Sequence, residues 1–381
     1  MAVSDRLASF GVTIFTEMTQ LALEHDAINL GQGFPNWDGA DFVKEAAEAS
    51  MATGGHDQYP PSSGIVPLRT ALAAHYGTRL GRDLDPMLEV TVTSGCTEAL
   101  AAGFLGLINP GDEVVIVEPY YDAYPVDVAL AGGVPRYVTL RAPDFALDHD
   151  ELRAVIGPQT RAIVLNNPHN PTGRVFTDAE LRAIAELCVE FDVIAISDEV
   201  YEEMVYEGEH RRLACYEGMW ERTLTLSSLG KTFSLTGWKV GWAIAPPGLT
   251  EGLRSAHQFL TFTTPTPVQH GAVAALGAPG SFYAEMRESY RAKRDLLARG
   301  LGETGFQVHV PQGTYFMMAG HADATDDKAF CHRLVAEARV AVIPPSVFYH
   351  DRAPGAGLVR FAFCKDESTL EEAIERIVQF S

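Results

Sequence analysis

Short runs of β-branched residues alternate with longer helical patterns between about residues 41 and 275, and this alternation constrains the fold most strongly. Strands alternating with helices are typical of an α/β/α sandwich around a mostly parallel sheet. One expected helix covers residues 178–191, with Thr177 as its N-cap. The predicted strands cover residues 89–93, 113–117, 161–165, 193–197 and 223–227.

A polar or glycine-rich cluster follows each of these predicted strands directly. In open α/β sheets, ligands bind beyond the carboxyl ends of the strands. Because those ends meet at one edge of a parallel sheet, we expect the clusters to converge on a single ligand site. The clusters are residues 94–97, 118–121, 166–173, 198–201 and 228–231.

The alternation fades after residue 275, which predicts a second, smaller α/β domain. A helical pattern over 281–302 would bridge the two parts, and the smaller part would have strands at 313–318, 340–343 and 358–363. The N-terminal stretch through Gly39 is expected to pack on the same part. We therefore predict a large domain of residues 40–285 and a small domain of residues 1–39 and 286–381.

The net charge of −21 argues against nucleic-acid binding and against docking on anionic membranes. Residues 1–20 carry charges throughout, so they predict neither a signal peptide nor a membrane span. The 12 histidines show no ligand spacing, and we predict no metal. Five scattered cysteines without a C-x-x-C pair indicate free thiols in a reducing cytoplasm.

Lys231 follows two serines, a leucine and a glycine at the end of a predicted strand, and Lys239 comes eight residues later. An amine close to a second cation and poorly solvated is easily deprotonated and becomes nucleophilic. The alternative is an ordinary surface lysine, which is the fate of most lysines. The neighbouring clusters favour the nucleophile.

The segment 94–97 precedes a helical pattern over 98–107, so its backbone N–H groups would form an anion site at a helix N-terminus. Lys239 and Ser228 could add a cation and a hydroxyl. The alternative is a plain N-cap with Thr97 as the capping side chain. The ligand that fits all the clusters is an aromatic ring carrying a phosphate and an aldehyde.

Asp198 ends a strongly apolar predicted strand, where an uncompensated carboxylate is costly. A protonated pyridine nitrogen would compensate its charge. Tyr201 could then hydrogen-bond a phenolate oxygen of the same ring beside Asn170.

Two further side chains suit a flat anionic ligand. Tyr121 follows a proline at a strand end and could stack on a ring, with core packing as its alternative. Core packing is the expectation for Tyr120 and Tyr124. Arg360 lies between apolar residues and could bind a carboxylate through two parallel hydrogen bonds, with an internal salt bridge as its alternative.

Together these motifs resemble the pyridoxal-phosphate (PLP)-dependent aminotransferases of fold type I, class I/II. Within that group the chain is most similar to kynurenine, glutamine and methionine aminotransferases and to the succinyldiaminopimelate type. The resemblance runs from about residue 28 to the C-terminus. Its carriers are residues 29–35, 58–61, 166–173, 198–201, 228–233, 236–241 and 359–361.

The resemblance implies Lys231 as the Schiff-base lysine, Asp198 as the partner of the pyridine nitrogen and Tyr201 as a further catalytic side chain. It also implies a homodimer, because the tyrosine matching Tyr59 reaches the phosphate of the neighbouring subunit. The implied cofactor-binding residues are Tyr59, Cys96, Thr97, Tyr121, Asn166, Asn170, Asp198, Tyr201, Ser228, Lys231 and Lys239. The implied substrate-binding residues are Gly33, Asn170, Phe262 and Arg360.

The implied function is transfer of an amino group from an L-amino acid to a 2-oxo acid. The donor stays open between methionine, glutamine, aromatic amino acids, kynurenine and N-succinyl-diaminopimelate, because residues 263–265 and Cys96 depart from the family pattern. A β-lyase acting on cysteine conjugates or cystathionine is one alternative. A non-catalytic PLP-binding regulatory module is another, which the lack of a basic DNA-binding segment disfavours.

Overall fold

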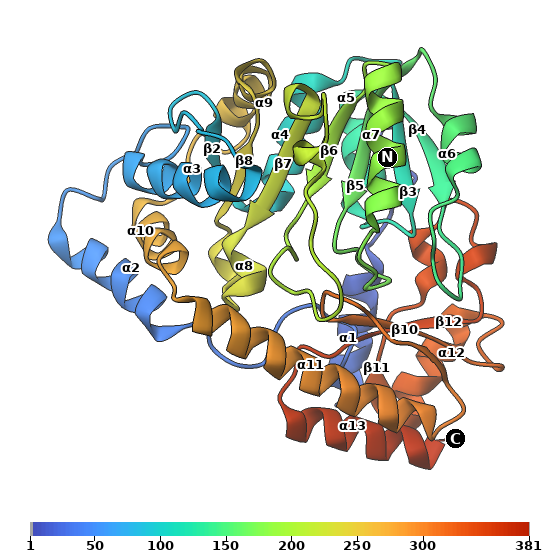
Figure 1. The fold of residues 1–381 in the computed structure, drawn as a ribbon. Helices are drawn as coiled ribbons and strands as arrows, with labels where there is room; N and C mark the ends of the chain where they lie inside the picture. Colours follow the sequence, from blue (N-terminus) through green and yellow to red (C-terminus); the bar gives the residue numbers. More distant parts are fainter. Residues whose placement is uncertain (1–2, 381) are drawn as a thin grey trace.

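A seven-stranded sheet forms the centre of the computed structural model, which describes residues 3–380 (Figure 1). Strand β8 runs antiparallel to both of its neighbours, and the remaining strands of this sheet run parallel to one another. The carboxyl ends of the parallel strands therefore share one edge, as predicted. The order is β2 (Val90–Thr93), β8 (Gly241–Ile244), β7 (Thr223–Ser228), β6 (Ile194–Asp198), β5 (Thr160–Asn166), β3 (Glu113–Glu118) and β4 (Val134–Thr139).

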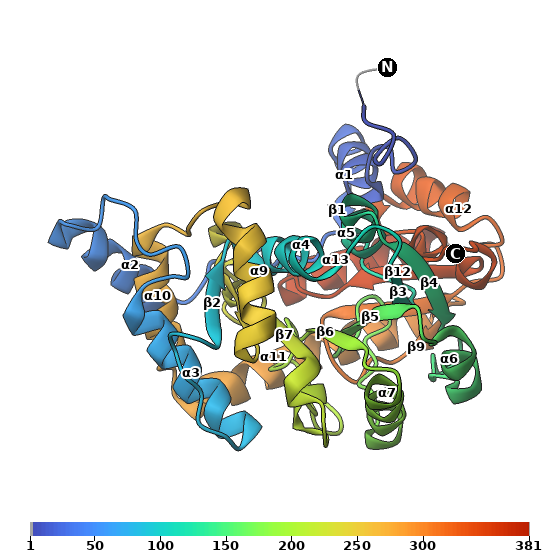
Figure 2. The same ribbon diagram turned by 90° about the horizontal axis from the view of Figure 1, so that it is seen from above.

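Helices cover both faces of this sheet because alternate strand residues point to opposite sides. Ile116 and Val164 pack in the same core cluster as α4 (Gly95–Leu107) and α5 (Ala123–Ala131). Their neighbours Val115 and Ile163 pack with α6 (His149–Val155) and α7 (Asp178–Glu190). Figure 2 shows α4 and α5 on one side of the sheet and α6 and α7 on the other. The predicted layered α/β fold is confirmed.

The five predicted strands and the helix after Thr177 are present, each within about two residues of its expected bounds. Thr177 caps α7 and forms a capping box with Glu180. Strands β4 and β8 were not predicted. The β4 run contains Pro135 and is exposed at the sheet edge, and β8 is only four residues long and begins with Gly241, so neither gives a strand pattern.

The smaller part of the protein contains an antiparallel sheet in the order β12 (Leu358–Ala362), β10 (Phe316–Gly320) and β9 (Gln307–His309). Strand β1 (Ile28–Asn29) pairs with β11 (Val340–Ala341), so the N-terminal stretch does pack there, as expected. The expected strand at 313–318 begins later, because Thr314 adopts a left-handed φ of 61°. The long helix α11 (Gly280–Gly302) crosses the predicted domain boundary at residue 285, and that division stays a prediction.

The remaining helices lie around these sheets. No helix within residues 3–380 is both long and apolar enough to cross a membrane. These helices are α1 (Ile14–Glu24), α2 (Asp41–Thr53), α3 (Val66–Leu80), α8 (Leu229–Thr232), α9 (Pro247–Leu260), α10 (Thr266–Leu276), α12 (Asp327–Arg333) and α13 (Glu367–Phe380).

Candidate active site

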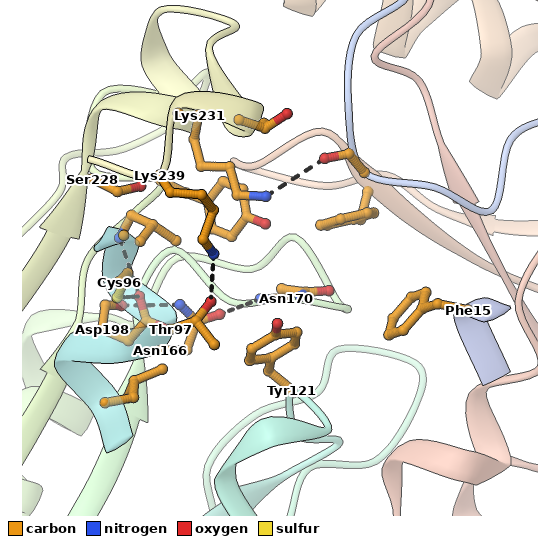
Figure 3. A pocket seen from close by; sticks show the side chains of 18 of the residues that line it. Phe15, Cys96, Thr97, Tyr121, Asn166, Asn170, Asp198, Ser228, Lys231 and Lys239 are labelled. Atoms are coloured by element: carbon orange, nitrogen blue, oxygen red, sulfur yellow. Dashed lines mark hydrogen bonds between the residues drawn. The ribbon is translucent and has the colours of Figure 1, made fainter. Parts of the chain in front are cut away.

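A cavity of about 350 Å³ lies where the carboxyl ends of β5, β6 and β7 face the smaller sheets (Figure 3). Residues from both parts of the protein line it, so the site forms only in the folded chain. All predicted site residues except Tyr59 and Phe262 are among them. The lining residues are Phe15, Gln32, Gly33, Gly95, Cys96, Thr97, Leu100, Tyr121, Tyr124, Asn166, Asn170, Asp198, Val200, Tyr201, Ser228, Gly230, Lys231, Thr236, Lys239, Val240, Phe316 and Arg360.

Lys231 projects into this cavity from the short helix α8, which follows the end of β7 (Figure 3). Its Nζ lies 3.5 Å from the Gly33 carbonyl oxygen and 5.6 Å from the ring centroids of Tyr201 and Tyr315. No carboxylate within residues 3–380 forms an ion pair with this amine. Burial lowers the pKa of Lys231 below that of an ordinary lysine, which favours the neutral, nucleophilic amine.

Asp198, the last residue of β6, presents a buried carboxylate that accepts hydrogen bonds on both oxygens. The Tyr124 hydroxyl donates at 2.7 Å, the Val200 N–H at 3.3 Å and the Cys96 thiol at 3.7 Å. Burial raises the pKa of Asp198, although these bonds and the nearby Lys231 oppose the rise. Tyr124 was expected only to pack in the core; its ring is buried, but its hydroxyl orients Asp198.

The two asparagines of the 166–173 cluster connect Asp198 to Arg360. The Asn166 amide donates to the Asp198 backbone carbonyl at 2.9 Å, and its oxygen accepts the Asn170 N–H at 2.6 Å. The Asn170 side-chain oxygen in turn accepts from Arg360 at 3.1 Å. A chain of hydrogen bonds therefore fixes the groups on opposite sides of the cavity relative to each other.

Arg360 in β12 is 1% exposed, yet within residues 3–380 no carboxylate pairs with its guanidinium. Its hydrogen bonds go to Asn170 and, at 2.7 Å, to the Gly31 carbonyl, while Phe316 packs 4.2 Å from its guanidinium carbon. Burial lowers the pKa of Arg360 to about 10, so it stays charged at neutral pH. The internal salt bridge considered as its alternative is absent from the described residues. A buried, unpaired cation is costly unless a ligand anion compensates it.

The first turn of α4 forms a polar corner of the cavity, and Ser94 rather than Thr97 is its N-cap. Lys239, in the left-handed conformation with φ 53°, donates to the Thr97 hydroxyl at 3.4 Å. The proposed capping role of Thr97 is therefore wrong. N–H groups of a first helical turn have no intrahelical acceptor, so together with Lys239 and Ser228 they suit a phosphate.

The loop of residues 31–34 borders the cavity from the side of the smaller sheets. Only glycine fits at Gly33, because an added Cβ would lie 2.6 Å from the Phe316 ring. Side chains donate hydrogen bonds to four successive carbonyl groups of this loop, and within residues 3–380 the Gly33 N–H has no hydrogen-bond acceptor. The pairs are Gly31 with Arg360 (2.7 Å), Gln32 with Cys364 (3.8 Å), Gly33 with Tyr315 (2.6 Å) and Phe34 with Lys365 (2.6 Å).

Tyr59 and Phe262 lie outside the cavity of their own chain. Tyr59 is 83% exposed and Phe262 47% exposed, and their rings meet edge to face at 5.3 Å. The structure places Phe262 at the surface of its own chain, in the turn after α9, so its role in the substrate pocket stays a prediction. Phe15 and Tyr315 lie at or beside the cavity and were not predicted, since neither belongs to a recognisable motif.

One group of possible metal ligands lies beside the site: Glu199, Glu202 and His210. Arg212 already pairs with both carboxylates, and Tyr76 donates to Glu202 at 2.5 Å. Burial raises the pKa of Glu202, but the combined effect of Arg212, His210 and Tyr76 is larger and lowers this pKa to about 2. The two carboxylates are therefore engaged in a buried network of ion pairs and hydrogen bonds rather than open to a cation.

The family model "Aminotransferase class I and II" matches residues 25–377. The chain belongs to this family. Class I and II aminotransferases are fold type I enzymes that depend on PLP, so the aminotransferase transfers amino groups between amino acids and 2-oxo acids. The resemblance stated from the motifs is confirmed.

Similar proteins match over nearly the whole aminotransferase. A probable N-succinyldiaminopimelate aminotransferase of Mycobacterium tuberculosis is 46% identical over 99% of this chain and 98% of its own. A kynurenine–oxoglutarate transaminase of Dictyostelium discoideum is 38% identical over 99% of this chain and 96% of its own. The solved structure of the Mycobacterium tuberculosis N-succinyldiaminopimelate aminotransferase superposes with a TM-score of 0.96, and that of an Escherichia coli methionine aminotransferase with 0.94 at 38% identity, both over 100% of each chain.

The residues of the cavity fit PLP. The polar corner at α4 suits the phosphate, the Asp198 carboxylate suits a protonated pyridine nitrogen, and the Lys231 amine is free to bond to the aldehyde. Tyr121 borders the space between these groups, where the flat ring would lie.

Proposed function

We propose that this aminotransferase acts on L-amino acids with a long apolar or aromatic side chain, and that Arg360 binds their α-carboxylate. The observation that carries the proposal is that two basic side chains without carboxylate partners among residues 3–380, Lys231 and the buried Arg360, line one cavity. The amine serves covalent chemistry, and the guanidinium serves carboxylate recognition. A substrate whose α-carboxylate binds Arg360 and whose amino group meets the cofactor beside Lys231 would have its α-carbon within reach of the Lys231 amine.

The chain's own groups have distinct roles in this proposal. PLP, when bound, supplies the electron sink for the electrons of the Cα–H bond. Asp198 keeps the pyridine nitrogen protonated, and Tyr201 with Asn170 binds the ring oxygen. Lys231, once released from the cofactor, moves the proton at the substrate α-carbon as base and then as acid. The Gly33 N–H adds a second donor to the substrate carboxylate.

The cavity wall supports the apolar preference. The cations that line it are Lys231, Lys239 and Arg360, each of which already has a role with the cofactor or the α-carboxylate. Among the other lining residues, Phe15, Leu100 and Phe316 supply apolar surface beside polar side chains such as Gln32 and Thr236. A second carboxylate on the donor would therefore find no free cation within the described lining. The 46% identity to a probable N-succinyldiaminopimelate aminotransferase nevertheless makes that substrate the second candidate.

A panel of amino donors tests the proposal. Methionine, phenylalanine, kynurenine, glutamine and N-succinyl-diaminopimelate are each supplied with 2-oxoglutarate and with other 2-oxo acids, and the new amino acid is measured. The proposal requires the highest kcat/KM among methionine, phenylalanine and kynurenine. A clear preference for N-succinyl-diaminopimelate would overturn it. Pyruvate and ammonia from a cysteine conjugate without any oxo acid would indicate the lyase instead.

Exchange of Arg360 for lysine is expected to raise KM for the amino donor by roughly 10- to 100-fold. Lysine keeps the charge but cannot make two parallel hydrogen bonds to a carboxylate. Steady-state kinetics at saturating PLP measure the effect. Arg294→Lys is the matched control, because Arg294 is equally buried but pairs with Glu207 and Asp295 away from the cavity. Equal effects of the two exchanges would contradict the assignment of Arg360.

We also propose that the enzyme is a cytoplasmic homodimer. The exposed pair of Tyr59 and Phe262 supports the dimer, because a second copy would cover these rings. Removal of the ring by Tyr59→Ala should accelerate PLP release severalfold in a dimeric enzyme. Light scattering gives the mass, and absorbance during dialysis gives the release rate. A monomer that retains PLP equally well with either residue would refute the shared site.

All five cysteines are free thiols, which supports a reducing compartment such as the cytoplasm.

A further inference from the structure

His257, on α9, does not line the cavity, yet both of its ring nitrogens face acceptors. Nδ1 lies 2.9 Å from a Glu98 carboxylate oxygen, and Nε2 lies 2.7 Å from the Ser62 backbone carbonyl. The ring is only 1% exposed, so water does not compete for these bonds. Glu98 belongs to α4, and Ser62 precedes α3.

This geometry determines the proton content of the ring. A backbone carbonyl and an ionised carboxylate can each only accept a hydrogen bond. A neutral imidazole carries a single N–H, so it can donate to only one of them. An imidazolium satisfies both contacts. Burial lowers the pKa of His257 and Arg254 on the same helix lowers it too, but the bonds to Glu98 and Ser62 raise it above the ordinary value. Glu98 and Arg254 are the charged groups recorded around the ring.

On one side of this ion pair, Glu98 contacts the first turn of α4, which forms the polar corner of the cavity that suits the phosphate (the phosphate corner). The second carboxylate oxygen of Glu98 accepts the Ser94 N–H at 3.0 Å, and Ser94 is the N-cap of α4. Cys96 and Thr97, one and two residues further into the helix start, line the cavity. Glu98 therefore sets the direction of the turn whose N–H groups suit the phosphate.

The Ser62 end leads to the segment of residues 59–65, which carries Tyr59. Hydrogen bonds connect this segment to residues 261–264 at several points. The Thr263 hydroxyl donates to the Pro61 carbonyl at 3.2 Å. The Gln269 amide accepts the Ile65 N–H at 2.8 Å and donates to the Thr264 carbonyl at 2.6 Å.

We propose that His257 is a positioning residue whose imidazolium joins the phosphate corner at α4 to the segment of residues 59–65. Its effect on the cofactor is indirect: with the ring in place, the first turn of α4 and the Tyr59 segment keep a fixed spacing. The link to PLP rests on the proposed roles of Cys96, Thr97 and Tyr59, whereas the proton content of the ring does not.

Three variants of the holoenzyme test the proposal. His257→Gln and Glu98→Gln are each expected to release PLP about tenfold faster, since each breaks a buried charge-assisted bond. The double variant should be little worse than either single one, because the two residues act as a pair. Excess PLP should restore turnover, which a general loss of folding would not allow. His309→Gln, at a half-buried histidine that does not line the cavity, should release PLP at the native rate.

Nitrogen-15 NMR of histidine-labelled native protein reads the proton content of the ring directly, with the variants used only to assign its signal. The signal lost in His257→Gln, or shifted in Glu98→Gln, should show both nitrogens protonated at pH 7.5. A neutral tautomer there, or native PLP release in both variants, would overturn the proposal. A separate outcome distinguishes the two proposals. If the native enzyme transfers no amino group, but its His257 ring is doubly protonated and both variants release PLP faster, the proposed function fails and the role of His257 stands.

Discussion

Lys231→Ala should lose turnover by about 10⁴-fold or more, which is the upper range for a positioned general base. Among residues 3–380, the Lys231 amine is the one group beside the Gly33 carbonyl that can both bond to the PLP aldehyde and move a proton at the substrate α-carbon. The variant should still bind PLP, because the phosphate corner and Asp198 remain. Steady-state turnover with a preferred donor and the absorbance of bound PLP measure the two effects separately.

Lys293→Ala is the control for this experiment. Lys293 is also mostly buried, and burial lowers its pKa as well, but its amine bonds to Ser289 outside the cavity. Its removal should leave transamination close to native. Borohydride treatment of the native holoenzyme should label the peptide that contains Lys231. Appreciable turnover by Lys231→Ala, or a label on another lysine, would remove the basis of the proposed roles.

Asp198→Asn should lower the rate of amino transfer by roughly 10²- to 10³-fold. Breaking a buried ion pair by removing one partner costs about 3–5 kcal/mol, and about 1.36 kcal/mol corresponds to a factor of ten in rate. Asparagine keeps the shape and can still accept the Tyr124 bond, but it no longer stabilises a protonated pyridine nitrogen. Stopped-flow measurement of the single half-reaction with a preferred amino donor gives the rate directly.

Asp127→Asn provides a matched aspartate. Asp127 on α5 is 7% exposed, and burial raises its pKa to about 7, so it is partly neutral under assay conditions. It does not line the cavity, and its exchange should change the half-reaction little. A native rate in Asp198→Asn would show that another group controls the protonation of the ring. An equal loss in Asp127→Asn would indicate that the effect comes from general destabilisation.

The sequence predicted the large sheet and most of its functional edge because those signals are local. Each predicted strand is a short β-branched run, and each functional cluster follows its strand directly in the chain. A parallel sheet then brings Asn166, Asp198 and Ser228 together without further information. The family motifs made Lys231 and Arg360 recognisable for the same reason.

Contacts between distant residues were not predictable in this way. The Tyr124 hydroxyl meets Asp198 across 74 residues, and the Lys365 amine meets the Phe34 carbonyl across 331. Whether a tyrosine only packs or also donates a hydrogen bond depends on which group the folded chain places opposite it. Sequence periodicity carries no information about that partner. The surface position of Phe262 likewise depends on the turn after α9, which sequence periodicity does not reveal.

Five of the seven strands of the large sheet, the residues at their ends and the family were thus determined by the sequence itself, because neighbouring residues carry those signals. Tertiary structure alone decided that Arg360 has no carboxylate partner within residues 3–380, that side chains bond to the carbonyl groups of residues 31–34, and that both nitrogens of the His257 ring form hydrogen bonds. Burial and partner geometry set the charge and direction of a side chain, and both arise only when segments hundreds of residues apart pack together.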